Sequence, residues 1–349
     1  MKAAVFKAPG APLVIEDVPD PAPGPEELVL KVRASGICGT DLHWSERPDG
    51  SAGWRALEPG SVMGHEFAGE VVEVGRDVRG QWRVGERVCA QPFIGCGRCA
   101  HCAAGRAYRC EQVTMRASAA LTGAYAEYTR IGAAATFRLP EAVSFDEGAL
   151  VEPLAVGLNA VAKARLEPGD SVLILGAGPV GIAVALWCRF FGARHIVVSD
   201  LVGKRAERAI AFGATAAIDA SQEDVPSRVR QLAGGQPRVV FDCVGVPGSL
   251  QLAIDYAPFD ARVVVVGLCM AADRFFPAKA MTKELDLTFV FVYRRQDFEI
   301  VVDMLGRGRI AAGGLVTDKV GFDTFSATFE ALKTPGDQIK VMLEPSLCP

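Results

Sequence analysis

The fold of this chain is decided by residues 171–200, SVLILGAGPVGIAVALWCRFFGARHIVVSD. A short apolar run meets a G-x-G-x-x-G turn, a helix-like segment follows, and a second β-branched run closes on Asp200. In such a turn the first glycine, Gly176, makes the tight bend, and the second, Gly178, lets a pyrophosphate approach the backbone. The third, Gly181, lets the helix pack closely on the strand. Because the motif has this context and an acid follows 19 residues after its last glycine, it predicts a dinucleotide-binding unit.

The same stretch also has the length and apolar character of a membrane span, since Arg189 is the one charged residue between Val172 and Ala193. Three glycines and Pro179 in its first half, and the strand pattern that follows at once, favour the dinucleotide interpretation. A phosphate would then rest near Pro179 on the helix N-terminus, where unpaired N–H groups and the helix dipole favour negative charge.

Asp200 also predicts which dinucleotide binds. A carboxylate at the end of the second strand accepts hydrogen bonds from the adenosine ribose hydroxyls and repels a 2′-phosphate, so NAD is favoured over NADP. Lys204 and Arg205 lie nearby and leave NADP open, although both also suit solvated positions at the start of the next helix.

Composition limits the number of domains, the partners and the cellular location that we expect. The chain has 349 residues, 50% of them hydrophobic, which is enough for two domains. The net charge of -4 and the lack of a basic run argue against nucleic acid as a partner. Lys7 interrupts any signal-peptide core, so we expect a cytoplasmic protein with reduced thiols and no membrane association. Ten cysteines in such a compartment indicate metal before disulfides.

Four of these cysteines form a C-x2-C-x2-C-x7-C motif: Cys96, Cys99, Cys102 and Cys110. Four thiolates this close together can surround one ion tetrahedrally, and a filled shell leaves no position for substrate, so the motif predicts a structural zinc. An iron–sulfur cluster also accepts four cysteines, but no second cluster and no characteristic proline supports it. His101 lies inside the motif as an alternative ligand.

The pattern of strands and helices changes near Ala155. Before it, short strand-like runs separated by prolines and glycines predict a β-rich, barrel-like domain. After it, helix-like segments alternate with apolar strand-like runs, which predicts a parallel, doubly wound sheet. The expected fold class is therefore α/β, with a β-rich domain beside the doubly wound one.

Five motifs in this order resemble those of the zinc-dependent medium-chain alcohol dehydrogenases, and the sorbitol, butanediol and threonine dehydrogenase branch most closely. They are residues 36–43 (GICGTDLH), residues 64–66 (GHE), the four-cysteine segment, residues 147–154 (EGALVEPL) and residues 176–181. The similarity covers nearly the whole chain. It implies a GroES-like catalytic domain at residues 1–155 and 295–349, and a Rossmann NAD-binding domain at residues 156–294.

The resemblance implies a catalytic zinc in addition to the structural one. Cys38 and His65 match its ligands, and Glu66 matches a glutamate that binds the metal or lies beside it. Glu152 replaces the second cysteine of ordinary alcohol dehydrogenases and binds zinc directly or through water. Zinc with an open position lowers the pKa of an alcohol, which prepares hydride transfer to a nicotinamide.

The resemblance also implies a proton relay and cofactor contacts. Thr40 matches the hydroxyl that first takes the alcohol proton, and His43 matches the outer member of the relay, although each also suits an ordinary structural or surface role. Val180 matches the backbone position that meets the pyrophosphate. Arg205 matches an arginine that packs against the adenine and ribose.

The chain departs from sorbitol dehydrogenases in the expected substrate pocket. They carry an arginine just before a late tyrosine, where this chain has Val292, and a tyrosine after the relay histidine, where it has Trp44. With Trp54 and Phe93 as further pocket residues, the site is more apolar than a polyol needs. We therefore expect a secondary alcohol or vicinal diol with apolar substituents, oxidised to its ketone, with a polyol or L-threonine as alternatives.

Two other classes stay open. A catalytically silent NAD- or zinc-binding protein would have lost the zinc ligands, which this chain retains. A zinc-free quinone reductase would lack both metal motifs. By analogy with bacterial relatives we expect a homotetramer or dimer that pairs edge strands of the parallel sheet, with residues 262–267 and 285–291 as candidate edges.

Overall fold

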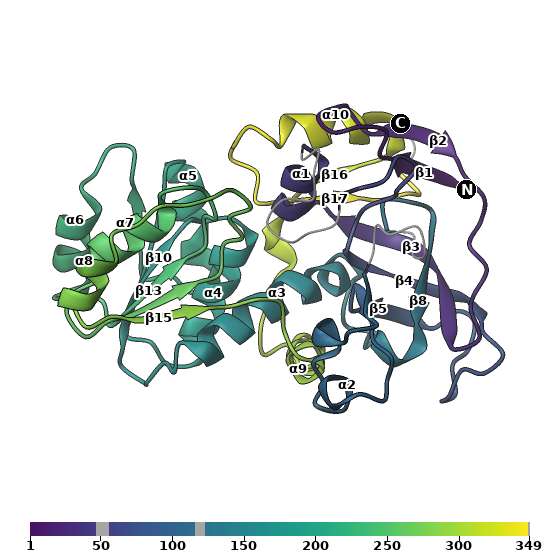
Figure 1. The fold of residues 1–349 in the computed structure, drawn as a ribbon, viewed down its shortest axis with the longest axis horizontal. Helices are drawn as coiled ribbons and strands as arrows, with labels where there is room; N and C mark the ends of the chain where they lie inside the picture. The colour runs from purple at the N-terminus through teal and green to yellow at the C-terminus, as the bar shows by residue number, and fades with distance from the viewer. Residues whose placement is uncertain (47–55, 116–122, 348–349) are drawn as a thin grey trace. The chain divides into compact units, whose positions relative to one another are not determined.

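The computed structural model describes residues 1–46, 56–115 and 123–347, which form two compact units (Figure 1). Unit 1 contains Met1–Glu152, Arg294–Thr334 and Lys340–Pro349, and unit 2 contains Pro153–Tyr293 and Pro335–Ile339. Unit 1 is β-rich and unit 2 is built around a parallel sheet, so the predicted α/β class is confirmed.

Unit 1 is organised around one long strand, β3 (Glu27–Gly36), which pairs antiparallel with three others. These are β4 (Glu66–Val74), β8 (Tyr128–Gly132) and β17 (Lys340–Leu343). The sheet also includes β5 (Arg87–Ala90), β9 (Thr136–Arg138) and β16 (Val316–Val320). Its order in the described residues is β16-β17-β3-β4-β5-β9, with β8 paired to β3. Two short pairs lie apart from it: β1 (Lys2–Val5) with β2 (Val14–Asp17), and β6 (Phe93–Ile94) with β7 (Thr114–Met115).

Helices connect these strands. They are α1 (Gly39–Ser45), α2 (Ala100–Ala103), α3 (Phe145–Lys163), α9 (Arg295–Gly306) and α10 (Phe322–Ala331), with short 3-10 turns η2 (Ala107–Arg109), η3 (Ala133–Ala135) and η5 (Gly313–Leu315). Helix α3 begins at a capping box, in which Ser144 and Glu147 each accept a backbone N–H of the other. It continues past Glu152 into unit 2.

The period-two alternation of β3 builds the core of its sheet. Leu28, Leu30 and Val32 point to one face, where they pack with Phe67 of β4 and Val88 of β5. Full burial of each such side chain stabilises the fold by about 1.5–3 kcal/mol. This packing joins β3 to β4, the two strands whose adjoining ends carry Gly36 and Glu66.

Unit 2 contains six parallel strands in the order β12-β11-β10-β13-β14-β15. Their bounds are β10 (Ser171–Leu175), β11 (His195–Asp200), β12 (Ala216–Asp219), β13 (Val239–Asp242), β14 (Arg262–Val265) and β15 (Asp286–Phe289). The strand order reverses between β10 and β13, which marks the place where doubly wound sheets bind ligands outside their carboxyl ends.

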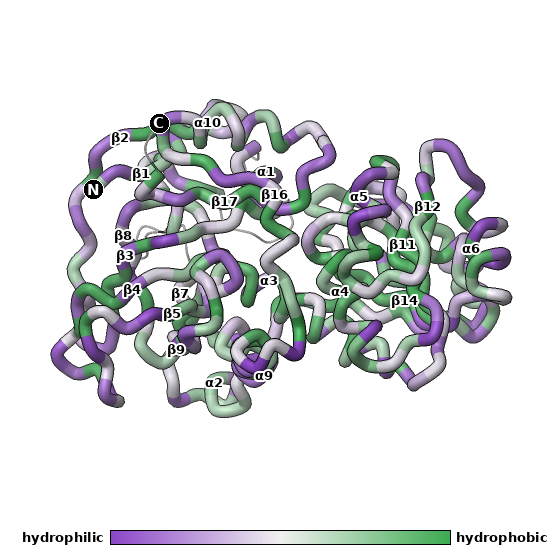
Figure 2. The backbone as a smooth tube through the Cα atoms, turned by 180° about the vertical axis from the view of Figure 1, so that it is seen from behind, coloured by the Kyte–Doolittle hydropathy of each residue, from purple (hydrophilic) through white to green (hydrophobic). Residues whose placement is uncertain are grey.

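The helices of unit 2 cover this sheet. They are α4 (Pro179–Phe190), α5 (Gly203–Arg208), α6 (Val225–Ala233), α7 (Ser249–Tyr256) and α8 (Pro277–Thr282), with the 3-10 turn η4 (Ala209–Phe212). Figure 2 shows β11 and β14 as hydrophobic runs and α6 as partly hydrophilic. Parallel strands are buried on both faces, whereas a surface helix buries one stripe, here Val225, Val229 and Ala233.

The strand order corrects one expectation about the sheet edges. Residues 262–267 contain β14, which lies between β13 and β15 and is therefore an interior strand. The sequence pattern does not distinguish the two, because interior and edge strands of a parallel sheet both read as short apolar runs. Of the two candidate edges, only residues 285–291, which contain β15, lie at the edge.

Residues 171–200 form β10, the 12-residue helix α4 and β11, as the motif predicts. In the described part of the chain, no helix has both the length and the apolar character needed to cross a bilayer. Gly176 has a φ of 90°, a conformation that favours glycine. A Cβ at Gly181 would collide with the carbonyl oxygen of Gly176, whereas a Cβ at Gly178 would meet no atom within 4 Å.

We expect Gly181→Ala to lower the melting temperature and Gly178→Ala to leave it unchanged. Overpacking costs about 1–3 kcal/mol, and about 1 kcal/mol shifts the melting temperature by roughly 2–4 °C in a domain of this size class. Calorimetry of both variants beside the parent protein measures the difference. Equal melting temperatures for the two variants would contradict the close approach at Gly181.

Candidate active site

Three metal-ligating side chains meet in unit 1 where β3 ends and β4 begins. Ligand atoms of Cys38, His65 and Glu66 all lie within 4.8 Å of one another. Strand register explains this, because Gly36 of β3 pairs with Glu66 of β4. Cys38 follows β3 as the N-cap residue of α1, and His65 directly precedes β4. Antiparallel pairing thus joins two motifs that are distant in the sequence.

A buried carboxylate orients His65. Its Nδ1 lies 3.1 Å from Oδ1 of Asp41, and the other oxygen of Asp41 accepts a 2.6 Å hydrogen bond from the hydroxyl of Tyr125. Asp41 is 1% exposed and Tyr125 is fully buried. A carboxylate bound to Nδ1 leaves Nε2 for a metal, as around zinc-binding histidines. The roles of Asp41 and Tyr125 were not predicted from the sequence. The position of Asp41 inside the GICGTDLH motif is a signal that could have indicated its role.

The cluster attracts positive charge. Burial alone lowers the pKa of His65, but Asp41 and Cys38 outweigh it and raise that pKa well above its ordinary value. A divalent cation can take the place of such a proton. One thiol, one imidazole and one carboxylate form a donor set typical of zinc. Cys38 Sγ, His65 Nε2 and a carboxylate oxygen of Glu66 therefore fit a catalytic zinc.

A buried lysine pairs with Glu66. Nζ of Lys340 lies 2.5 Å from Oε2 of Glu66 and donates a 2.8 Å hydrogen bond to the backbone oxygen of Ile37. Both charged side chains are 1% exposed. Burial alone lowers the pKa of Lys340, but Glu66, followed by Cys38 and Glu152, raises it above the ordinary value. Lys340 is therefore charged and occupies one oxygen of Glu66.

Lys340 is a residue of the site that sequence patterns missed. It begins β17, whose four residues are all buried. Lysine is almost never fully buried unless it is paired, so a lysine beside the apolar run Val341–Leu343 is a signal that could have found it.

Glu152 lies in α3 and is 7% exposed. It acts on Lys340 through its charge, but the three-residue cluster in the described part of the chain does not include it. Pro153, which follows it, lacks an N–H and removes one hydrogen bond from the helix at this point. Glu152 as a zinc ligand stays a prediction.

The two relay residues lie on α1. Thr40 is half-buried two residues after Cys38, and His43 is exposed. They are three residues apart, so they share one face of the helix. This arrangement suits transfer of a proton from the half-buried Thr40 to the exposed His43, and the relay itself stays a prediction.

The predicted pocket residues lie on different elements. Trp44 of α1 is half-buried against the hydrophobic cluster that contains Phe325. Phe93 of β6 is 1% exposed, and its ring centroid lies 6.0 Å from that of Tyr108. Val292 belongs to unit 2 and is half-buried, and Trp54 lies outside the described residues. A pocket shared by these side chains stays a prediction.

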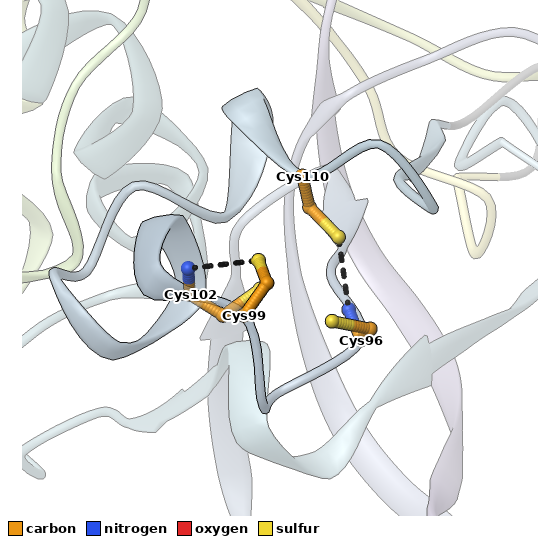
Figure 3. A group of neighbouring side chains, drawn as sticks. All are labelled: Cys96, Cys99, Cys102 and Cys110. Carbon is orange, nitrogen blue, oxygen red and sulfur yellow. Dashed lines mark hydrogen bonds between the residues drawn. The ribbon is translucent and has the colours of Figure 1, made fainter.

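The four cysteines of the C-x2-C-x2-C-x7-C motif converge in unit 1 (Figure 3). Their sulfur atoms all lie within 4.8 Å of one another. The backbone N–H of Cys96 donates to Cys110 Sγ at 3.3 Å, and that of Cys102 donates to Cys99 Sγ at 3.4 Å. Backbone hydrogen bonds, the strongest from Arg98, lower the pKa of Cys96 to about 6. Burial, in contrast, raises the pKa of Cys102 to about 12. The convergence of the four sulfur atoms is therefore what fits a structural zinc.

The glycine turn of unit 2 has the geometry of a phosphate site. Gly178 is the N-cap residue of α4 and Pro179 its first residue, so the missing N–H of proline costs nothing there. Val180 and Gly181 follow in the first helical turn, where backbone N–H groups lack helical partners.

Asp200 is fixed beside this turn. It accepts hydrogen bonds from the backbone N–H of Ala177 at 2.7 Å and of Val202 at 2.8 Å. Arg205, in the next helix, has a buried Nε with no hydrogen-bond partner among the described residues. Buried polar atoms are normally paired, so this nitrogen fits a ligand oxygen. The turn, Asp200 and Arg205 together suit a dinucleotide.

Comparison with known proteins agrees with this geometry. The model of the alcohol dehydrogenase GroES-like domain matches residues 24–141, and that of the zinc-binding dehydrogenases matches residues 179–307. Sorbitol dehydrogenase of Bacillus subtilis (strain 168) is 33% identical over 99% of this chain and 98% of that protein. L-threonine 3-dehydrogenase of Aeromonas hydrophila is 33% identical over 94% of each chain. The crystal structure of 2R,3R-butanediol dehydrogenase from Bacillus subtilis has a TM-score of 0.84 at 30% identity, over 99% of both chains.

Fold and site therefore define a zinc-containing, NAD-dependent dehydrogenase. The chain belongs to the zinc-dependent medium-chain alcohol dehydrogenase family. The four-cysteine lobe is accordingly its structural zinc site, which excludes the iron–sulfur alternative, and the cluster of Cys38, His65 and Glu66 is its catalytic zinc site.

We expect Lys340→Met to destabilise the zinc-free protein by about 3–5 kcal/mol, because without zinc it leaves the buried carboxylate of Glu66 unpaired. Lys319→Met is the matched control, since Lys319 pairs with Asp146 at 2.6 Å but is 42% exposed, and exposed pairs contribute about 0–1 kcal/mol. Denaturant unfolding measures both. The double variant Lys340→Met/Glu66→Gln should recover part of the lost free energy of unfolding. Equal losses in Lys340→Met and Lys319→Met would contradict the prediction that the buried pair contributes more than the exposed one.

We expect two zinc ions per chain. His65→Ala should remove one of them together with activity, and Cys99→Ser should remove the other and lower the melting temperature more, because structural zinc contributes directly to folding. Elemental analysis by mass spectrometry, combined with thermal unfolding, tests this. Iron in the purified protein, or one zinc in the unsubstituted chain, would contradict the assignment.

Proposed function

We propose that this dehydrogenase interconverts a secondary alcohol or vicinal diol bearing apolar substituents and the corresponding ketone. The observation that carries the proposal is the cluster of Cys38, His65 and Glu66, braced by Asp41 and Lys340. In the oxidation, the carbinol C–H bond breaks with its electron pair moving to NAD⁺ as hydride, and the hydroxyl proton goes to solvent. The products are the ketone and NADH.

Each residue has a definite task in this proposal. When bound, zinc supplies a Lewis acid that lowers the pKa of the alcohol hydroxyl. Asp41 keeps the His65 ring in one orientation, and Lys340 balances the charge of Glu66. Thr40 accepts the alcohol proton, and the exposed His43 passes it to solvent.

The substrate preference rests on side chains and on relatives. Val292 stands where sorbitol dehydrogenases carry a polyol-binding arginine, and an apolar wall offers hydroxyl groups no partner. One solved relative is a 2R,3R-butanediol dehydrogenase, and butanediol is a vicinal diol with apolar ends. Relatives that act on sorbitol or L-threonine by name keep those substrates as the alternatives. A silent binding protein is less well supported, because its zinc ligands would not need to converge.

The proposed cofactor preference is NAD over NADP. Asp200 presents a fixed carboxylate at the end of β11, where it would bind ribose hydroxyls and repel a 2′-phosphate. We also propose a cytoplasmic homotetramer or dimer that pairs β15 with its counterpart. Phe289, at the end of this edge strand, is 67% exposed, and Phe291 is 48% exposed. An exposed apolar edge is a template for strand pairing.

We expect chelator-sensitive NAD reduction with secondary alcohols and vicinal diols that carry apolar substituents. Their kcat/KM should exceed that of sorbitol and L-threonine by at least about tenfold, since a pocket without hydroxyl partners gains nothing from extra hydroxyl groups. NADH absorbance across the substrate panel measures this, with Cys38→Ser as an inactive control that still binds NADH. Turnover of sorbitol or L-threonine alone would overturn the substrate assignment, and no turnover with normal NADH binding would favour a silent protein.

A further inference from the structure

Val292 has a backbone conformation that its side chain disfavours. Its φ is 55°, in the left-handed region, where a β-branched residue is a genuine outlier. The other described non-glycine residues with positive φ are Arg165, Asp260 and Glu284, none of which is branched at Cβ. Such a conformation persists only where surrounding contacts impose it, and these positions cluster at ligand sites.

Asn159 supplies such a contact. Its Nδ2 donates a 2.7 Å hydrogen bond to the backbone oxygen of Val292, 133 residues further along the chain. Asn159 lies in α3 and is 6% exposed, and Tyr293, which follows Val292, is fully buried. A bond to this carbonyl holds the peptide plane between Val292 and Tyr293. It therefore restrains ψ of Val292 while the buried ring of Tyr293 anchors the next residue.

Val292 follows β15 at the carboxyl edge of the sheet, the edge where doubly wound sheets bind ligands. All six strands of unit 2 are parallel, so the segment after β15 shares the carboxyl edge with the glycine turn after β10 and with Asp200 of β11. Asp200 assigns the adenosine half of the dinucleotide to the β11 side, and the turn takes the pyrophosphate. We therefore expect the nicotinamide half to extend in the other direction, toward β13, β14 and β15.

We propose that Asn159 is a positioning residue for the nicotinamide end of the cofactor site, acting by holding Val292 in its left-handed conformation. The hydrogen bond restrains the backbone of the segment after β15, which would border the nicotinamide when the cofactor is bound. The proposal rests on the proposed function in one respect, since it takes Val292 to border the reacting end of the cofactor.

The test compares the binding of NADH with that of ADP-ribose, which lacks the nicotinamide. In Asn159→Ala we expect NADH to bind about tenfold more weakly and ADP-ribose to change by less than about twofold, because the contacts of Asp200 remain. Titration calorimetry and NADH fluorescence measure the two dissociation constants. If Asn159→Ala does not fold, Asn159→Leu, which keeps the volume but lacks the donor, replaces it.

A second substitution tests whether Asn159 acts through the backbone conformation of Val292. Glycine adopts positive φ without steric cost, so in a Val292→Gly background the loss of Asn159 should change NADH affinity by less than about twofold. Val292→Ala is the matched control, because it also removes the apolar side chain but keeps a Cβ. In that background the loss of Asn159 should still weaken NADH binding.

Equal losses of NADH and ADP-ribose affinity would overturn the proposal, since they would indicate general damage to unit 2. A double variant Asn159→Ala/Val292→Gly as weak as Asn159→Ala alone would overturn it as well. None of these measurements uses alcohol turnover. An enzyme that fails to oxidise any alcohol yet shows the predicted NADH pattern would therefore defeat only the proposed function.

Discussion

The buried ion pair between Lys340 and Glu66 is the constraint on which the catalytic unit depends. It joins β17, near the end of the chain, to β4, near its beginning, and both charges are removed from water. The desolvation of two such charges costs several kcal/mol per ion and is offset only by good geometry and further hydrogen bonds. Lys340 meets that condition with Glu66 on one side and the Ile37 carbonyl on the other. The last strand is thereby required for the metal site as well as for the sheet.

The two metal sites differ in how far apart their ligands lie in the sequence. The four-cysteine lobe is assembled within residues 96–110, so one short segment can form it by local turns. The catalytic cluster needs the β3–β4 pairing, the carboxylate of Asp41 and a lysine 274 residues from Glu66. Contacts of such long range form only after their loops are closed, at an entropic cost that local contacts avoid. The catalytic site therefore needs distant parts of unit 1 to pair, whereas the ligands of the lobe come from one segment.

This difference also sets what could be predicted from sequence. The glycine turn, the four cysteines and the division into a β-rich and a doubly wound part follow from local spacing and periodicity, and the structure has them. The order of the strands in the sheet does not follow from local patterns, which is why β14 was wrongly expected at an edge. Lys340, Asp41 and Tyr125 were missed because their roles lie in partners far along the chain. The left-handed conformation of Val292 could not be predicted from residue propensities, because a β-branched residue is expected to have a negative φ.

In unit 2, the carboxylate of Asp200 lies at the end of β11 and also binds the glycine turn. Asp200 uses one oxygen for the N–H of Ala177, inside the glycine turn, and the other for the N–H of Val202. Each oxygen keeps a further lone pair, so ribose hydroxyls can bind without displacing either bond. A substitution that removes the carboxylate to admit a 2′-phosphate would also leave two backbone donors without their partner. A substitution of Asp200 would therefore disturb the order of the glycine turn as well as the expected ribose contacts.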